Sequence, residues 1–196
     1  IEPRERAGLI GRNGHGKSTL LRMFIGEEKQ DSGDIIVPKD YRIGYLSQHL
    51  SFTEPTVLAE ACLALPILDG YWQEVHKAEE ILAGLGFALE DLEKAPAAMS
   101  GGFQIRLNLA KCLLQEPNLL LLDEPTNYLD IISVRWLKRF LQTWTGELLL
   151  ITHDREFMDS VTTHTLAIHR SKVRKAKGGT DKMYTLLAEE EELHEN

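Results

Sequence analysis

The stretch GLIGRNGHGKSTLL, residues 8–21, decides how the rest of this 196-residue sequence is interpreted. Within it, residues 11–18 fit the pattern G-x-x-x-x-G-K-[ST]. Apolar residues 7–10 before the pattern indicate a short buried strand, and residues 17–25 carry the i, i+4 apolar pairs of a helix. In that order, glycines let backbone N–H groups and the helix N-terminus surround phosphate oxygens. The stretch therefore predicts a phosphate-binding loop rather than a chance glycine-rich turn.

The residues of this loop have distinct expected parts in binding a nucleotide. Lys17 is expected to reach the β- and γ-phosphates, and the hydroxyl of Ser18 to coordinate Mg²⁺. His15 is interpreted as a variable position of the loop rather than as a catalyst. The candidate nucleotide-binding residues of the stretch are Gly11, Arg12, Asn13, Gly14, His15, Gly16, Lys17, Ser18 and Thr19.

The composition limits the class of protein that the sequence encodes. It is 43% hydrophobic and 27% charged, which is typical of one globular domain and not of a disordered chain. The 30 Asp and Glu residues against 22 Lys and Arg give a formal net charge of −8, so the chain as a whole is not a basic nucleic-acid binder. Cys62 and Cys112 lack the spacing of a zinc site or a disulfide framework, which favours a reducing cytosol.

Neither a membrane span nor a signal peptide is indicated. No apolar run approaches the roughly 20 residues needed to cross a bilayer. The first residues, IEPRE, have neither the charge nor the apolar core of a signal peptide. The sequence lacks an initiator Met and reaches its main motif almost at once, so we expect that it was cut from a longer protein.

Strand-like and helix-like segments alternate along the chain, which predicts an α/β domain with a largely parallel sheet. The predicted strands span residues 7–10, 35–37, 43–46, 119–122 and 148–151, with one or two more in 161–169. Other helices are predicted to open at residues 100–102 and to cover residues 133–142. The helix-like segments 56–65, 75–85 and 89–92 predict a helical insertion over residues 53–98. A basic run, 170–177, and an acidic helix-like segment, 181–196, are interpreted as solvated faces.

A pair of carboxylates follows the all-leucine segment at residues 119–122. Asp123 and Glu124 would stand at the carboxyl end of a buried strand, where open α/β sheets bind ligands. Asp123 is expected to hold Mg²⁺ through water, and Glu124 to orient or deprotonate the attacking water. Alone, such a pair would be an acidic strand end at the surface, but the phosphate loop favours the catalytic interpretation.

Three further features are weak signals by themselves. His153 follows the predicted strand 148–151 and is expected to face the crevice at the carboxyl ends of the strands, where it could sense a γ-phosphate. A lone histidine, however, is usually structural. Gln48 follows the strand 43–46, and a single glutamine at a strand end is usually only polar. The segment Ser100, Gly101 and Gly102 opens a helix, which is either a second anion cradle or a plain N-cap.

The motifs in this order resemble those of an ATP-binding cassette (ABC) ATPase over residues 1–176. The Walker A loop resembles residues 11–18, the Q-loop glutamine resembles Gln48, and the switch histidine resembles His153. The signature resembles residues 99–103, Walker B residues 119–124 and the D-loop residues 127–130. The motifs DEPTNYLD at 123–130 and ITHDREF at 151–157 are similar to those of the ABC-F subfamily. The aromatic Phe103 after the signature glycines resembles the first cassette of that subfamily more than the second.

The resemblance implies a P-loop NTPase fold, RecA-like, with a largely parallel sheet and an inserted helical subdomain. It assigns residues 1–176 to the nucleotide-binding domain, lacking its first strands, and residues 177–196 to the start of a linker helix between two cassettes. It implies a second cassette as partner, in the same parent chain or as a homodimer of the fragment. It also implies a cytoplasmic location, a ribosome contacted through regions outside this sequence, and no membrane insertion.

The resemblance also implies the role of each site residue toward ATP and Mg²⁺. Glu124 would be the catalytic base, His153 its γ-phosphate partner, and Lys17 the phosphate-binding lysine. The metal residues would be Ser18, Gln48 and Asp123. Because ATP is sandwiched between cassettes in this family, Ser100, Gly101 and Gly102 would touch ATP bound to the partner, and Asp130 would couple the two sites.

Departures from the family pattern leave alternatives open. Phe103 stands where the signature usually has Gln, and the upstream aromatic that normally stacks on adenine is outside the sequence. An ATPase subunit of a membrane transporter would share the catalytic residues and differ in its partner. A cassette that binds ATP as a switch without useful turnover is a third interpretation, against which the intact Asp123, Glu124 and His153 argue.

Overall fold

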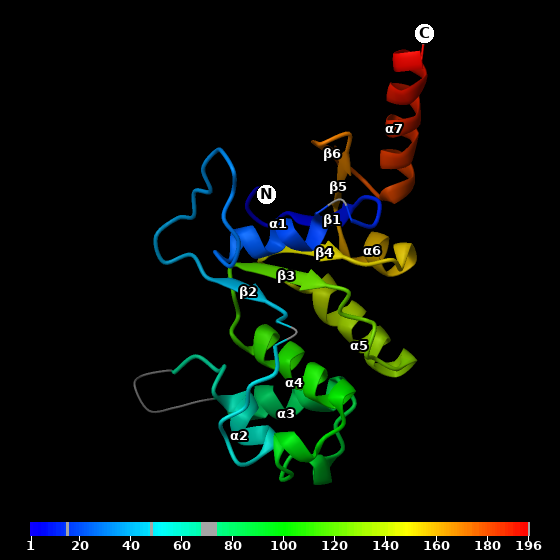
Figure 1. Ribbon diagram of the computed structural model, residues 1–196. Helices are drawn as coiled ribbons and strands as arrows, with labels where there is room; N and C mark the ends of the chain where they lie inside the picture. The colour runs from blue at the N-terminus through cyan, green and yellow to red at the C-terminus, as the bar shows by residue number, and fades with distance from the viewer. Residues whose placement is uncertain (15, 48, 68–73, 196) are drawn as a thin grey trace.

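A mixed sheet organises the part of the chain that the computed structural model describes, residues 1–14, 16–47, 49–67 and 74–195 (Figure 1). Within those residues it has six strands in the order β2-β3-β4-β1-β5-β6. The strands are β1 (Arg6–Ile10), β2 (Ile43–Tyr45), β3 (Leu119–Asp123), β4 (Glu147–Ile151), β5 (His164–His169) and β6 (Lys172–Lys177). All neighbouring pairs are parallel except β5 and β6, which are antiparallel. The predicted α/β fold with a largely parallel sheet is confirmed.

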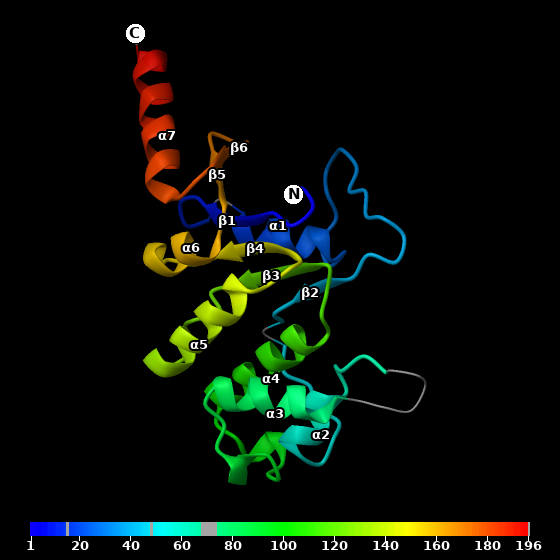
Figure 2. The ribbon, with the colours of Figure 1, turned by 180° about the vertical axis from the view of Figure 1, so that it is seen from behind.

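The central strands are apolar on both faces because both faces are covered. On β3 and β4, Leu120, Leu122, Leu148 and Leu150 belong to the larger apolar cluster, together with residues of α4 (Gly101–Leu114), α5 (Ile131–Gln142) and α6 (Arg155–Val161). The alternate residues Leu119, Leu121, Leu149 and Ile151 belong to a second cluster with Leu21 of α1 (Lys17–Phe24). The sheet therefore lies between α1 on one side and α4, α5 and α6 on the other (Figure 1 and Figure 2).

The helical segments after β2 form a second body below the sheet in Figure 1. It contains α2 (Val57–Cys62), α3 (Val75–Gly84) and two 3₁₀ turns, η1 (Leu89–Asp91) and η2 (Pro96–Ala98). Helix α4 packs against both α2 and α3, and the same apolar cluster runs from this body to β3 and β4. The predicted limits of the insertion, residues 53–98, stay a prediction, but the body that these helices form also includes α4.

Helix α7 (Thr180–Glu195) ends the described chain and projects beyond β5 and β6 (Figure 1). None of the described helices is long and apolar enough to cross a membrane.

The predicted strand at residues 35–37 is wrong, because the structure has no strand there. Ile36 is 89% exposed, and Ile35 and Val37 are exposed too. The segment lies in the loop between α1 and β2, outside the sheet (Figure 1). Among the described strands, β2 pairs with β3 alone. A β-branched run supplies strand propensity, but a strand also needs a neighbouring strand for its backbone groups.

The region after β4 also differs from the prediction. Residues 155–161 form α6, a helix that the sequence analysis did not predict, with the Asp154 side chain accepting from the amide of Phe157 as its N-cap. Of the one or two strands expected in 161–169, the structure has one, β5. The next strand, β6, lies in the basic run 170–177, where no strand was predicted. Lysines and arginines suit such a strand because β6 is an edge of the sheet, where charge discourages pairing with another chain.

Truncating one core leucine tests how much stability the β3 core provides. Leu120 is fully buried, so Leu120→Ala should lower the free energy of unfolding by about 2–5 kcal/mol, through lost burial and a residual cavity. Leu89, which is 78% exposed, gives a matched control, and Leu89→Ala should change that free energy by less than about 0.5 kcal/mol. Urea denaturation monitored by circular dichroism measures both. Equal losses for the two variants would contradict the assignment of Leu120 to the core.

Candidate functional site

The predicted phosphate loop joins β1 to α1. Gly14 and Gly16 both have a φ of 80°, a left-handed conformation that favours glycine over residues with a side chain. Gly16 is the N-cap of α1, so the helix begins without a capping side chain and its first amides point toward the loop. Lys17 donates from Nζ to the carbonyl oxygens of Gly11 at 2.8 Å and Arg12 at 3.2 Å. His15 lies outside the described residues.

Ser18 and Asp123 meet although 105 residues separate them. Ser18, in the first turn of α1, donates from Oγ to Oδ2 of Asp123, the last residue of β3, at 2.5 Å. A hydroxyl and a carboxylate are oxygen ligands of the kind that Mg²⁺ binds, usually with phosphates and water completing its shell. The two residues therefore fit a magnesium ion carried by a nucleotide. Gln48, the third predicted ligand, lies outside the described residues.

The described part of the chain does not form a metal site made of protein side chains alone. Among the described residues, no group of three or more His, Cys, Asp or Glu side chains is placed to hold a metal ion. Such a site is not what Mg²⁺ requires, because this ion is typically bound through one or two carboxylates plus the phosphates of the substrate.

Glu124 and His153 lie together at the same edge of the sheet. The backbone N–H of Glu124 donates to the carbonyl of Ile151 at 2.8 Å, which ties the end of β3 to the end of β4. The Glu124 carboxylate lies 3.4 Å from Nε2 of His153 and accepts from the His153 amide at 3.4 Å. The His153 side chain is 73% exposed, whereas that of Glu124 is 19% exposed. A carboxylate held beside an open imidazole can accept a proton from water or share a proton with the imidazole.

The segment Ser100, Gly101 and Gly102 is not brought to the phosphate loop. Ser100 is the N-cap of α4, and its Oγ accepts from the amide of Phe103 at 3.5 Å. Helix α4 packs on the face of the sheet opposite α1, so the segment and the loop belong to different sides of the molecule (Figure 1). Gly101 leaves open space where a side chain would stand, whereas a Cβ at Gly102 would stand 4.0 Å from the Tyr128 ring. The segment is therefore separate from the phosphate loop of the same chain.

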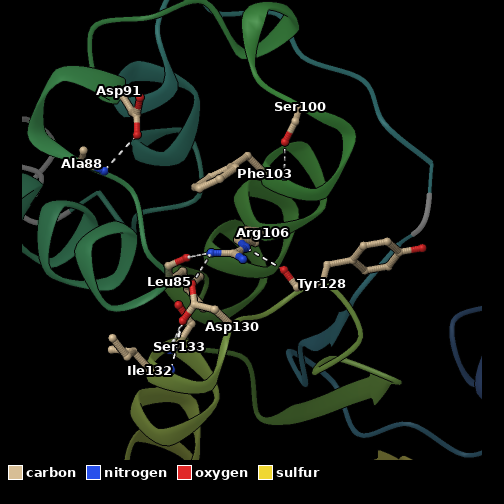
Figure 3. A network of polar contacts seen from close by, with 10 residues as sticks. All are labelled: Leu85, Ala88, Asp91, Ser100, Phe103, Arg106, Tyr128, Asp130, Ile132 and Ser133. Atoms are coloured by element: carbon tan, nitrogen blue, oxygen red, sulfur yellow. Dashed lines mark hydrogen bonds and ion pairs between the residues drawn. The ribbon is translucent and has the colours of Figure 1, made fainter.

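Both carboxylate oxygens of Asp130 accept hydrogen bonds from within the chain. As the N-cap of α5, its Oδ1 accepts from the amides of Ile132 at 3.0 Å and Ser133 at 2.9 Å. Its Oδ2 accepts from Arg106 at 3.3 Å (Figure 3). The Ser133 amide and, next among the favourable contacts, the Arg106 guanidinium hold the pKa of the Asp130 carboxyl below its ordinary value. The coupling role expected for Asp130 stays a prediction.

Two residues of α4 that the sequence analysis missed hold loops near the site. Arg106 reaches the loop before α5, and Asn108 donates from Nδ2 to the carbonyls of Ser47 at 3.3 Å and His49 at 3.2 Å. Asn108 thereby clamps the loop on either side of position 48. The one signal in the sequence is that both are polar residues in an otherwise apolar stretch of helix.

An ion pair with a buried carboxylate holds the other end of this loop, which joins β2 to α2. The carboxylate of Glu60 in α2 is 1% exposed and pairs with Lys111 of α4. Its other oxygen accepts from the amides of Thr53 and Glu54, each at 2.9 Å. Burial raises the pKa of Glu60, but the contact with Lys111 and the two amides outweigh burial and leave that pKa below its ordinary value.

Comparisons with known proteins agree with this arrangement. The family model described as "ABC transporter" matches residues 1–127. The chain is 33% identical over 217 residues to "Putative ATP-binding protein YdiF" of Bacillus subtilis. The aligned region covers 91% of this chain and 34% of YdiF. The chain is also 33% identical to ABC transporter F family member 5 of Arabidopsis thaliana, over 81% of this chain and 29% of that protein.

A solved structure is similar at the level of the whole fold. It is a complex of an archaeal ribosomal stalk protein with an archaeal ribosome recycling factor. The match has a TM-score of 0.75 and 27% sequence identity, and it covers 96% of this chain and 37% of the matched chain. The resemblance to ABC ATPases is thus confirmed, and the Arabidopsis relative supports its ABC-F form by name. The chain spans about a third of the length of the curated relatives.

The Glu60 carboxylate makes stability depend on pH. Because the pKa of Glu60 is lowered in the folded state, its contribution is complete above the unfolded value of 4.5 and is lost as pH falls below 4.5 toward the folded value. Glu60→Gln should lower the free energy of unfolding at pH 7 and weaken its dependence on pH below 4.5. Urea titrations at pH 7 and at pH 4 measure the difference. The matched control is Glu90→Gln, an exposed residue that should change neither; equal pH dependence of Glu60→Gln and the unaltered protein would contradict the prediction.

Proposed function

Because the chain belongs to the ABC transporter family, we propose that it binds ATP with Mg²⁺ and hydrolyses ATP as one cassette of an ABC-F protein. The single observation that carries the proposal is the convergence of three strand ends. The loop that leads to Lys17 and Ser18 follows β1, the Asp123–Glu124 pair stands at the end of β3, and His153 comes after β4. These three strands run parallel. The contacts Ser18–Asp123 and Glu124–His153 join them in pairs.

Each of these groups has one chemical task in the proposed reaction. Lys17 holds the β- and γ-phosphates and offsets their charge, together with the amides at the start of α1. Ser18 and Asp123 would hold Mg²⁺, which when bound neutralises charge between the β- and γ-phosphates. Gln48 is assigned to the same metal by the family resemblance.

The proton in this reaction is handled by Glu124. Its carboxylate orients a water and accepts one proton as the water oxygen bonds to the γ-phosphorus. The bond from that phosphorus to the bridging oxygen breaks, so ADP and inorganic phosphate leave. We assign His153 to the γ-phosphate and to holding the Glu124 carboxylate in position, and the 3.4 Å between its imidazole and that carboxylate supports the second role.

The partner in this proposal is a second cassette. The segment 100–102 lies on the other side of the sheet from the phosphate loop, so a composite site needs a second copy of each. We assign residues 1–176 to the cassette and 177–196 to the start of a linker, of which α7 forms the helix. ATP-driven closure of two cassettes would then be coupled to the ribosome in the cytoplasm. The relatedness to an ABC-F protein and to an archaeal ribosome recycling factor supports the ribosome as a further partner.

The role of Glu124 separates binding from hydrolysis. In the full-length protein, Glu124→Gln should keep the Kd for ATP within about twofold and lower kcat by about a hundredfold or more, because the amide cannot accept the proton. A coupled phosphate-release assay gives kcat, and titration with a fluorescent ATP analogue gives Kd. Lys17→Ala, which should lose nucleotide binding, and the exposed Glu156→Gln, which should change neither, are the controls. Turnover at the normal rate by Glu124→Gln would refute the base assignment.

Ribosome association tests the cellular part of the proposal. The full-length Glu124→Gln protein should pellet with ribosomes when ATP is present and stay in the supernatant with ADP, because ATP without turnover holds the cassettes closed. Ultracentrifugation through a sucrose cushion followed by immunoblotting measures this. ATP binding without pelleting would contradict the ribosome as partner and favour a transporter subunit or another protein partner.

A further inference from the structure

One arginine side chain joins helix α4 to the end of α3 and to the loop between β3 and α5. Arg106 lies in α4, about one and a half turns after its first residue. It donates from Nε to the carbonyl of Tyr128 at 2.7 Å and from Nη1 to the carbonyl of Leu85 at 2.9 Å. Nη1 also lies 3.3 Å from Oδ2 of Asp130 (Figure 3). The Arg106 side chain is 11% exposed, so these contacts are largely shielded from water.

The three acceptors come from two parts of the chain, the end of α3 and the loop between β3 and α5. Leu85 is the C-cap of α3, Tyr128 lies in the loop after β3, and Asp130 is the N-cap of α5. The Tyr128 carbonyl and the Asp130 carboxylate are both part of the predicted D-loop, residues 127–130. Arg106 therefore connects the helix that begins at the signature segment with the loop that begins α5.

The surroundings of the guanidinium are shaped to receive it. Its central carbon lies 4.6 Å from the centroid of the Phe103 ring, a cation–π distance. The Phe103 ring in turn meets Phe87 edge to face at 5.0 Å. Gly86 has a φ of 91°, and a Cβ there would stand 2.6 Å from Nη1 of Arg106. The Phe103 ring thus lies against the guanidinium, and the lack of a side chain at Gly86 leaves room for its Nη1.

We propose that Arg106 is a positioning residue that holds segments 100–102 and 127–130 at a fixed separation, so that cassette closure brings both onto the partner together. The inference rests on the proposed function, in which these two segments face the second cassette. Ser100 belongs to the same rigid helix as Arg106, and Tyr128 is held directly. Gly102 would contact the Tyr128 ring if it carried a Cβ, at 4.0 Å, so the two segments are also neighbours in space.

The geometry requires arginine and not merely a positive charge. A planar guanidinium presents N–H groups in a rigid fork, which here serves two carbonyls and a carboxylate at once. A lysine ammonium is a single point of charge, so it can pair with Asp130 but cannot reach the Leu85 and Tyr128 carbonyls from the same position. The conservative variant therefore separates positioning from electrostatics.

The test uses the full-length protein with Arg106→Gln, Arg106→Lys and a matched control, Arg135→Gln, whose arginine is exposed on α5. Three quantities are measured: Kd for a fluorescent ATP analogue, kcat per nucleotide-binding-competent protein, and amide hydrogen exchange of residues 126–133 without nucleotide. For both Arg106 variants we expect an unchanged Kd and a kcat lower by about tenfold to a hundredfold, the size of effect that misplaced groups produce. Exchange at 126–133 should be faster, while exchange in β3 and β4 stays as in the unaltered protein. The control should match the unaltered protein throughout.

Several results would overturn the proposal. Unchanged exchange at 126–133 would show that Arg106 does not hold the loop. Faster exchange with normal kcat would show that its hold does not matter for turnover. Full recovery by Arg106→Lys would assign the effect to charge alone. If Arg106→Gln does not fold, Arg106→Lys decides on the same three quantities.

Failure of the proposed function gives a different pattern. If the unaltered protein neither binds nor hydrolyses ATP, the proposed function fails. Exchange at 126–133 then decides on Arg106 alone: faster exchange in the variants supports the positioning role, and unchanged exchange overturns it.

Discussion

The parallel pairing of two buried leucine strands is the constraint on which the site depends. In β3 and β4, Leu119 pairs with Glu147 and Asp123 with Ile151, so both strands end at the same level. Each strand buries alternate leucines against opposite helical layers, so packing on both faces holds the strands in the sheet. Because Asp123 pairs with Ile151 in this register, Glu124 and His153 leave their strands side by side.

Helix α4 transmits this arrangement to the helical body. Its apolar face belongs to the same cluster as Leu120 and Leu148, so the helix is anchored to the sheet. Its polar side chains then act on loops: Asn108 clamps the segment around position 48, and Arg106 holds the loop before α5. One helix therefore carries the segment that begins at Ser100 and also touches two loops that approach the nucleotide or the partner in the proposed function.

Local patterns in the sequence predicted some elements well and others poorly. The phosphate loop, the all-apolar strands and the helix after Ser100 were predictable because each has a motif or a continuous apolar run. Residues 35–37 were predicted as a strand on propensity alone, and the structure leaves them exposed because no neighbouring strand pairs with them. Helix α6 was missed because its seven residues carry too short a period to be distinguished from the flanking strands.

The sequence by itself determined the class of fold, the family and the candidate residues for phosphate and proton chemistry, because these depend on residue type and spacing along the chain. Only the tertiary structure decided which of them meet. Ser18 and Asp123 are 105 residues apart and come into contact at 2.5 Å because β1 and β3 flank β4 in one parallel sheet. The partners of Arg106 and Asn108 are backbone carbonyls, which every residue possesses, so only the folded path of the chain can select them.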